Sequence, residues 1–277
     1  MDVWVGTAGY AYPAWVGGFY PPKTSSERML PFYATRFAAV EINSSFHRPP
    51  TVEQVRKMAR KVPAGFQFTL KVPQSASHEF KPDDLPAFRL AAEALAERGQ
   101  LLGLLVQVAE SFHNTPGHRE WLTTIREQLQ PFPLAVEFRH VSWDVPGLPG
   151  WVEANGFDLV SVGVPAIPTL FPTGPRVVGR RFYARLHSQN AAAWYAGGPA
   201  RYDFDYPEAV IGKWADAVAA AAERGVERAT VFFNNCVGVQ AVQNATRFAD
   251  LLRERHPRVN VIRPPEPDER SLFDEVG

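Results

Sequence analysis

The sequence contains very little cysteine and no excess of charge of either sign. Cys236 is the only cysteine in 277 residues, so no disulfide can form within the chain and no cysteine-rich metal site can be built. The 29 Lys and Arg residues balance the 29 Asp and Glu residues. A chain without net charge has no overall field that draws it to nucleic acid or to an anionic membrane.

Long hydrophobic runs are also missing. The longest nearly apolar stretch, residues 101–108, is far shorter than the ~20 residues needed to span a bilayer. The N-terminus shows no basic segment followed by an apolar one, which is the pattern of a secretory signal. We therefore expect a soluble, cytoplasmic protein without a membrane partner.

The chain does have a regular alternation of strand-like and helix-like segments. The expected strands are residues 2–6, 40–43, 66–72, 101–108, 133–139, 157–162, 181–187 and 229–235. The expected helices are residues 27–37, 51–60, 87–98, 115–129, 150–155, 207–224 and 239–253, with polar loops at 44–48 and 75–79. Eight such units, in a chain near the ~250 residues usual for the fold, predict a closed parallel (β/α)8 barrel of the TIM-barrel type.

We expect residues 1–262 to form this barrel as a single domain. Residues 263–277 are rich in proline and charge, which favours a loose C-terminal tail. The main alternative is an open, doubly wound sheet. That fold predicts a G-x-G-x-x-G turn after the first strand, and the sequence has none there.

The segment Val40-Glu41-Ile42-Asn43 shows how reactive side chains are placed in such a unit. Apolar and polar residues alternate with the period of a strand, and the strand ends before Pro49 and Pro50. Thr51 and Gln54 then form a capping-box pattern that begins a helix. A carboxylate and an amide therefore lie where a strand ends.

Other expected strands place polar residues in the same way. The carboxyl ends of barrel strands meet at one mouth, where active sites of this fold lie. The residues that this rule collects are Glu41, Asn43, Lys71, Gln107, Glu137, Arg139, Arg185, His187, Asn234 and Asn235.

Two interpretations of this set stay open. The first is a pocket for an anionic ligand, in which Glu41 and Glu137 do acid–base work and His187 moves protons. Lys71, Arg139 and Arg185 would then hold the anion, with the amides and Arg48 as further ligand-binding candidates. In the second, the charges only neutralise one another in a structural layer of ion pairs.

Aromatic residues follow several of the expected strands. Tyr12, Trp15 and Trp143 are candidates for stacking on a base or a sugar, although such rings more often pack a loop against the barrel. No H-E-x-x-H or clustered His/Asp spacing is present, so we predict no metal site. The sequence names no cofactor.

The residues assembled so far resemble the DUF72 (YecE-like) family over nearly the whole chain. The motifs that carry the resemblance are Gly6-Thr7-Ala8-Gly9-Tyr10, Glu41-Ile42-Asn43-Ser44-Ser45-Phe46, Glu137-Phe138-Arg139-His140, Arg185-Leu186-His187 and Phe233-Asn234-Asn235. The sequence departs from the family pattern at His47, Ser188 and Val108-Ala109-Glu110. The resemblance implies a TIM-barrel-like fold and brings no established reaction.

Three classes of function fit these observations. The first is an enzyme with a polar barrel-mouth pocket for a phosphate- or carboxylate-bearing ligand, a hydrolase or lyase that acts on a phosphorylated or sugar-like substrate. The second is a protein that binds or processes nucleic acid with its aromatic rim, which the zero net charge disfavours. The third is a non-catalytic binding scaffold. The oligomeric state is not indicated.

Overall fold

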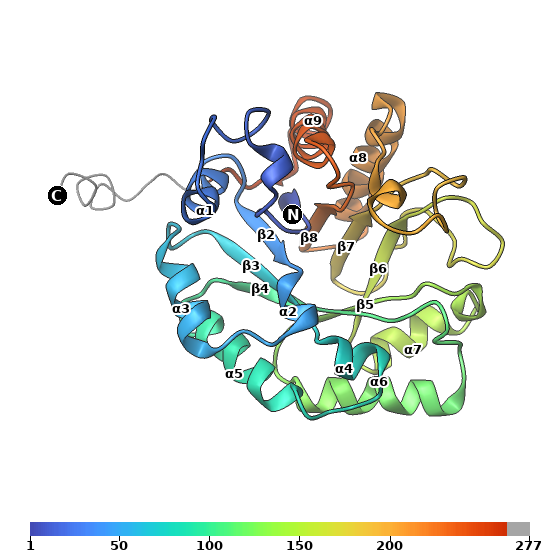
Figure 1. The fold of residues 1–277 in the computed structure, drawn as a ribbon. Helices are drawn as coiled ribbons and strands as arrows, with labels where there is room; N and C mark the ends of the chain where they lie inside the picture. The colour runs from blue at the N-terminus through green and yellow to red at the C-terminus, as the bar shows by residue number, and fades with distance from the viewer. Residues whose placement is uncertain (265–277) are drawn as a thin grey trace.

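The computed structural model describes residues 1–264 and contains one curled parallel sheet (Figure 1). The nine strands run in the order β2-β3-β4-β5-β6-β7-β8-β1-β9, and every pairing is parallel. Their bounds are β1 Asp2–Thr7, β2 Ala39–Ile42, β3 Gln67–Lys71, β4 Leu101–Gln107, β5 Leu134–Glu137, β6 Asp158–Gly163, β7 Arg181–Leu186, β8 Arg228–Phe233 and β9 Asn260–Val261.

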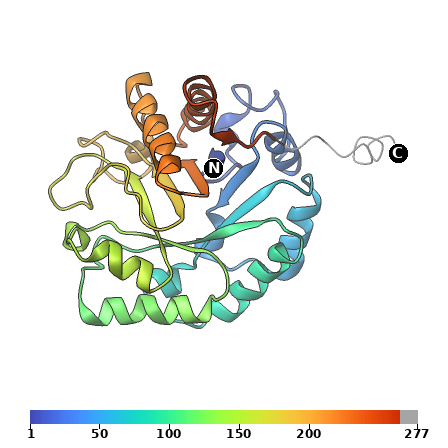
Figure 2. The same cartoon turned by 180° about the vertical axis from the view of Figure 1, so that it is seen from behind.

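Helices surround the sheet on the outside. They are α1 Ser26–Ala34, α2 Ser44–His47, α3 Val52–Arg60, α4 Gln74–His78, α5 Leu85–Ala96, α6 Pro116–Gln128, α7 Leu148–Ala154, α8 Glu208–Glu223 and α9 Gln240–Arg255. Short 3-10 turns lie at Pro13–Trp15, Val141–Trp143 and Pro199–Tyr202. Figures 1 and 2 show α3, α5, α6 and α7 along one side of the curled strands and α1, α8 and α9 along the other.

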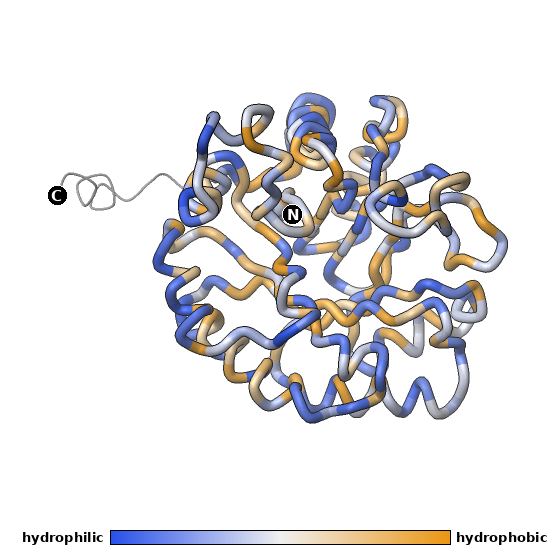
Figure 3. Tube along the Cα trace, viewed as in Figure 1, coloured by the Kyte–Doolittle hydropathy of each residue, from blue (hydrophilic) through white to orange (hydrophobic). Residues whose placement is uncertain are grey.

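Hydrophobic periodicity explains this arrangement. In α8, Ile211, Trp214, Ala215 and Val218 are buried, which is the spacing of a single helix face turned to the sheet. Figure 3 shows much of the hydrophilic chain at the periphery and hydrophobic stretches along the strands. No helix within residues 1–264 is both long and apolar enough to cross a membrane.

The predicted closure of the barrel is found only in part. Between β1 and β2 there is no regular ladder, only one isolated parallel bridge between Ala8 and Glu41. Its hydrogen bond joins the Gly9 N–H to the Glu41 carbonyl at 2.7 Å. The sheet is therefore curled as in a TIM barrel, but its hydrogen-bonded ladder is open at this seam.

The Tyr33 hydroxyl lies in the seam. It accepts the Thr7 N–H at 2.9 Å and donates to the Ala39 carbonyl at 3.3 Å, so it links β1 to β2 where a ladder bond is missing. Gly6 permits the close approach, because a Cβ at this position would overlap the Ala39 carbonyl oxygen. Burial raises the pKa of Tyr33, which keeps the hydroxyl protonated.

Several expected features are confirmed and others need correction. Thr51 and Gln54 form both bonds of the capping box, and Thr115 caps α6 ahead of Pro116. The loops expected at 44–48 and 75–79 contain the short helices α2 and α4, and β9 was not expected. These short elements lack the long apolar repeat on which recognition of a helix or strand depends.

The expected strands are shorter in the structure at several carboxyl ends. Asn43, Arg139, His187, Asn234 and Asn235 lie just beyond their strands rather than inside them. The predicted tail falls outside the described residues apart from residues 263 and 264. The single-domain assignment of residues 1–262 stays a prediction.

Candidate functional site

The carboxyl ends of five strands bring charged side chains together inside the curled sheet. We call this group the strand-end cluster. It comprises Glu41 of β2, Lys71 of β3, Gln107 of β4, Glu137 of β5 with Arg139 just beyond it, and Tyr183 and Arg185 of β7 with His187 just beyond it.

Arg185 lies at the centre of the cluster and is only 1% exposed. Its Nη1 donates to Glu137 Oε2 at 2.5 Å and its Nη2 donates to Glu41 Oε1 at 2.6 Å. The Tyr183 hydroxyl donates to the second oxygen of Glu41 at 2.8 Å. Burial by itself would lower the pKa of Arg185, but the two carboxylates outweigh burial and raise it. Arg185 is therefore a permanent cation that joins β2 to β5.

Glu137 is buried between two guanidinium groups. Its Oε1 lies 2.6 Å from Arg139 Nη2, and its other oxygen accepts from Arg185. Burial alone would raise the pKa of Glu137, yet the charges of Arg139 and Arg185 hold it well below the usual range. The group is a carboxylate at neutral pH.

His187 is neutral in this environment. Burial and the charge of Arg139 lower the pKa of His187 to about 3. Its Nδ1 lies 2.9 Å from the Asn234 amide nitrogen, which can only donate, so the ring proton is on Nε2. Nε2 lies 3.2 Å from Glu137 Oε1. Asn234 thereby sets the tautomer of His187.

Lys71 differs from the two arginines because it has no carboxylate partner. Its Nζ donates to Gln107 Oε1 at 3.0 Å and lies 3.9 Å from the centre of the Phe46 ring. No Asp or Glu oxygen within residues 1–264 forms an ion pair with it. Burial, then the charge of Arg185, lowers the pKa of Lys71 to about 7, and the more distant effects of Glu41 and Glu137 only partly oppose this.

Arg139 also retains hydrogen-bonding capacity. Its Nη2 binds Glu137 and lies 3.4 Å from His187 Nε2, while its Nε is buried and has no partner within residues 1–264. Its guanidinium lies 5.9 Å from the centre of the Trp194 ring. Arg139 and Lys71 are each 8% exposed, against 1% for Arg185, so they are the cations of the cluster that solvent reaches.

The structure thus brings together Glu41, Lys71, Gln107, Glu137, Arg139, Arg185 and His187, with Asn234 behind them. Asn43 is half-buried just after β2, and its Oδ1 is buried without a partner in the described part of the chain. Asn235 instead fixes the backbone, since its amide donates to the Phe204 carbonyl and to Asn244 Oδ1. Whether any of these residues binds a ligand stays a prediction.

The predicted aromatic candidates lie in packed loops. Trp15 and Trp143 are fully buried. The Trp143 ring stacks on Phe138 at 4.1 Å and its Nε1 donates to the Phe112 carbonyl. Tyr12 packs on Trp15 and donates to the Ala8 carbonyl at 2.6 Å. Buried rings with these contacts support the packing alternative for both tryptophans.

Three residues at the site were not among the predicted site residues. Tyr183 lies two positions before Arg185 on the same face of β7, so the strand period was a usable signal. Phe46 and His78 lie on the short helices α2 and α4, and their rings meet edge to face at 5.0 Å. Burial, with the charges of Lys71 and Arg139, lowers the pKa of His78 to about 4, so His78 is a neutral base beside both cations.

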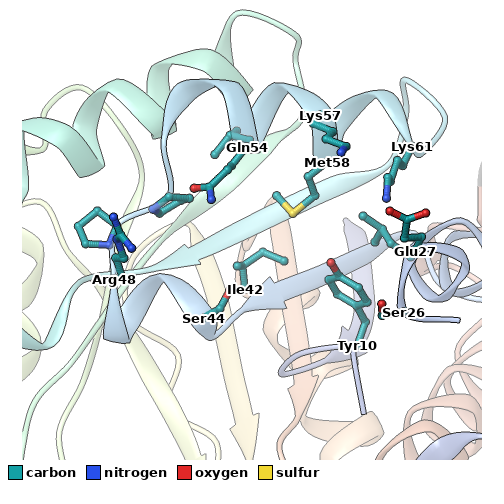
Figure 4. Close-up of a pocket in the computed structure, with 14 residues that line it drawn as sticks. Tyr10, Ser26, Glu27, Ile42, Ser44, Arg48, Gln54, Lys57, Met58 and Lys61 are labelled. Carbon is teal, nitrogen blue, oxygen red and sulfur yellow. The ribbon is translucent and has the colours of Figure 1, made fainter. Parts of the chain in front are cut away.

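A pocket lies outside the strands, between α1 and α3, and it takes in the predicted residue Arg48 (Figure 4). We call it the α1–α3 pocket; its volume is about 400 Å³. Ile42, Leu30, Val55 and Met58 form apolar lining, and Arg48, Lys57, Lys61 and Glu27 line it with charge. None of these four charged residues forms an ion pair within residues 1–264, and Arg48, Lys57 and Glu27 are exposed. The structure therefore separates Arg48 from the strand-end cluster.

Metal-binding geometry is not found in the described chain. Within residues 1–264, no group of three or more His, Cys, Asp or Glu side chains is placed to hold an ion. The histidine and carboxylates of the strand-end cluster are instead bonded to one another and to arginine.

Comparison with known proteins gives consistent matches. A DUF72 family protein (TM1631) from Thermotoga maritima MSB8 has a similar structure, with a TM-score of 0.84 and 35% identity, over 91% of this chain and 100% of that one. A DUF72 family protein (EF0366) from Enterococcus faecalis V583 superposes with a TM-score of 0.81 and 26% identity, over 91% of this chain and 95% of that one. The UPF0759 protein YunF of Bacillus subtilis (strain 168) is 24% identical over 257 residues, which cover 84% of this chain and 89% of YunF.

The family match extends over almost the entire sequence. Residues 4–271 match the family described as "Protein of unknown function DUF72". These residues include all the strands that carry the strand-end cluster. The chain belongs to the DUF72 family.

Proposed function

We propose that this chain is an enzyme that binds a small anionic ligand at Lys71 and Arg139 of the strand-end cluster. The observation that carries the proposal is the pairing of carboxylates with cations in the strand-end cluster. Glu41 pairs with Arg185, Glu137 pairs with Arg185 and Arg139, and Lys71 is the remaining cation of the cluster without a carboxylate partner in the described part of the chain. An anion at this position would complete the pairing.

The free hydrogen-bond donors support the same position. Arg139 Nε, like Arg185 Nε, is buried without an acceptor among residues 1–264, and leaving such a donor unpaired costs roughly 1–3 kcal/mol. A carboxylate or phosphate oxygen binds guanidinium and ammonium groups strongly, because the hydrogen bonds are charge-assisted. Lys71 and Arg139 are also the cations of the cluster that solvent reaches.

The proposal divides the cluster by role. Arg185, Glu41 and Glu137 hold the strand ends together, and Glu137 orients Arg139. Lys71 is the group suited to proton transfer, because its pKa, which burial lowers to about 7, lies near the working pH of an acid or base catalyst. The acid–base roles that we predicted for Glu41, Glu137 and His187 stay predictions. The hydrolase or lyase assignment is likewise part of the proposal.

Isothermal titration with inorganic phosphate and with small carboxylates tests the site. We expect binding in the wild type and a loss of roughly tenfold or more in Arg139→Ala, since a hydrogen bond to a charged group contributes about 1.5–3 kcal/mol. Arg48→Ala is the matched control, because Arg48 lies in the α1–α3 pocket. Equal affinities in wild type and Arg139→Ala, or no binding of any anion, would overturn the proposal.

The nucleic-acid alternative is tested in the same samples. Trp15 and Trp143 are fully buried, so no candidate tryptophan offers a free face to a base. Salt-dependent binding of a single-stranded oligonucleotide, combined with no response to small anions, would favour that alternative over the proposed enzyme.

A further inference from the structure

Lys71 combines the features of an amine that can act as a nucleophile. It is 8% exposed, it is fixed at the end of β3, and its Nζ donates to the Gln107 side-chain carbonyl and lies against the Phe46 ring. A protonated amine without a carboxylate is costly to bury. The unprotonated amine has a lone pair, and that form attacks carbonyl carbon.

We propose that Lys71 forms an imine with the carbonyl group of a small 2-oxo acid, whose carboxylate is bound by Arg139. This inference rests on the anion site proposed above and adds the substrate class. A 2-oxo acid carries its carboxylate on the carbon next to the carbonyl. Arg139 can therefore bind the carboxylate while Lys71 reacts with the adjacent carbonyl carbon.

The step is balanced without any further reactant. The Nζ lone pair forms a bond to the carbonyl carbon while the C=O π electrons move to oxygen. A proton passes from nitrogen to that oxygen and gives a carbinolamine. The remaining proton on nitrogen is then transferred to the hydroxyl group, and the C–O bond breaks to release water. The nitrogen lone pair forms the C=N bond that joins Lys71 to the former carbonyl carbon.

The charged and titratable groups around Lys71 favour this chemistry. The groups that affect its charge are Glu41 on β2, Glu137 and Arg139 at the end of β5, Arg185 on β7, and His78 on α4. Both carboxylates are already bound to arginine, and they only partly oppose the lowering of the Lys71 pKa by burial and Arg185. His78 is a neutral imidazole whose pKa is lowered by burial and by the charges of Lys71 and Arg139.

Reductive trapping of the wild-type protein tests the proposal. The protein is incubated with pyruvate and sodium cyanoborohydride, digested, and analysed by mass spectrometry for the reduced adduct on each lysine. The chain offers internal controls, because the other lysines are exposed or half-buried: Lys23, Lys57, Lys61, Lys81 and Lys213. We expect Lys71 to be modified roughly tenfold more than any of them, because the neutral amine is the form that reacts.

Two further arms test the carboxylate and the amine. Acetone has a ketone but no carboxylate, so it should show no preference for Lys71. Arg139→Ala should lower pyruvate trapping at Lys71 by roughly tenfold, because a charge-assisted contact is lost. The rate of trapping at Lys71 should rise through pH 7, which matches the pKa of about 7 that burial gives this amine.

The outcomes separate this inference from the proposed function. Adducts spread evenly over the exposed lysines, or equal trapping of acetone and pyruvate at Lys71, would overturn the imine. Suppose that pyruvate binds to both the wild type and Lys71→Arg in titrations, and that trapping of the wild type gives no adduct on Lys71. The imine is then wrong and the anion site stands. If no anion binds and no adduct forms, both proposals are wrong.

Discussion

Two regions of the molecule collect positive charge, and they treat it in opposite ways. In the strand-end cluster, Arg139 and Arg185 are buried and each binds a carboxylate within 2.6 Å. In the α1–α3 pocket, Arg48 and Lys57 are exposed and form no ion pair within residues 1–264. Water readily solvates charge at the second region, whereas at the first the guanidinium groups depend mainly on other side chains.

This difference shows in which region a charged side chain without an ion-pair partner is informative. An unpaired lysine in an open pocket is ordinary, because water hydrates it and salt screens it. An unpaired lysine in the buried cluster is exceptional, and Lys71 is that residue. We therefore place the proposed anion site in the cluster and not in the α1–α3 pocket.

Removing one carboxylate from the cluster should produce the largest effect. Glu137→Gln leaves Arg139 and Arg185 buried with one carboxylate fewer, and we expect the free energy of unfolding to fall by about 3–5 kcal/mol. Urea denaturation measures the change. Glu27→Gln in the α1–α3 pocket is the matched control, with an expected change within about 0.5 kcal/mol. Similar losses in the two variants would remove the contrast between the regions.

The second prediction concerns the pH dependence of stability above neutrality. Burial lowers the pKa of folded Lys71 to about 7, below its usual 10.5, so the unfolded chain binds more protons between these values. Stability from this group therefore rises with pH. Between pH 7 and pH 9, the wild type should gain about 2 kcal/mol relative to Lys71→Met. Parallel curves for the two proteins across this range would show that Lys71 keeps its proton when folded.

The third prediction concerns mild acid. Burial and Arg139 lower the pKa of folded His187 to about 3, below its usual 6.5, so the unfolded chain binds the extra proton as pH falls through 6.5. The wild type should lose about 1.5 kcal/mol relative to His187→Asn between pH 6.5 and pH 5. Denaturation at a series of pH values tests this. An unchanged difference between the two proteins would mean that folded His187 binds its proton over the same pH range as in the unfolded chain.

The smallest effects are expected in the α1–α3 pocket. Lys57→Ala and Arg48→Ala should each change the free energy of unfolding by no more than about 0.5 kcal/mol, because exposed side chains without partners contribute little. Thermal or urea unfolding at low and high salt provides the measurement. A loss above about 2 kcal/mol in either variant would show that this pocket has a structural role like that of the cluster.

The sequence alone was sufficient for much of the fold and part of the site. Alternating patterns located the strands that carry Glu41, Lys71, Glu137 and Arg185, and the strand-end rule placed these residues together. The same rule did not predict the position of Arg48, because α2 intervenes between β2 and this residue. It also could not distinguish Trp15 and Trp143, which are buried, from rings that face solvent.

The open seam between β1 and β2 had no sequence signal either. A strand pattern shows that a segment has two apolar faces but says nothing about which edge pairs with which. Here the Tyr33 hydroxyl and the absence of a side chain at Gly6 set how the two edges meet. Both residues are understood only once the edges are adjacent in space.

Local chemistry in the sequence determined the repeating strand–helix units, the helix caps and the polar residues at the strand ends, because each depends on neighbours a few positions away. Tertiary structure decided which charges are paired. Arg185 binds Glu41 and Glu137 across the curled sheet, over sequence separations of 144 and 48 residues, and leaves Lys71 as the surplus cation. Burial sets the electrostatic cost of each charge, and burial exists only after the strands have come together.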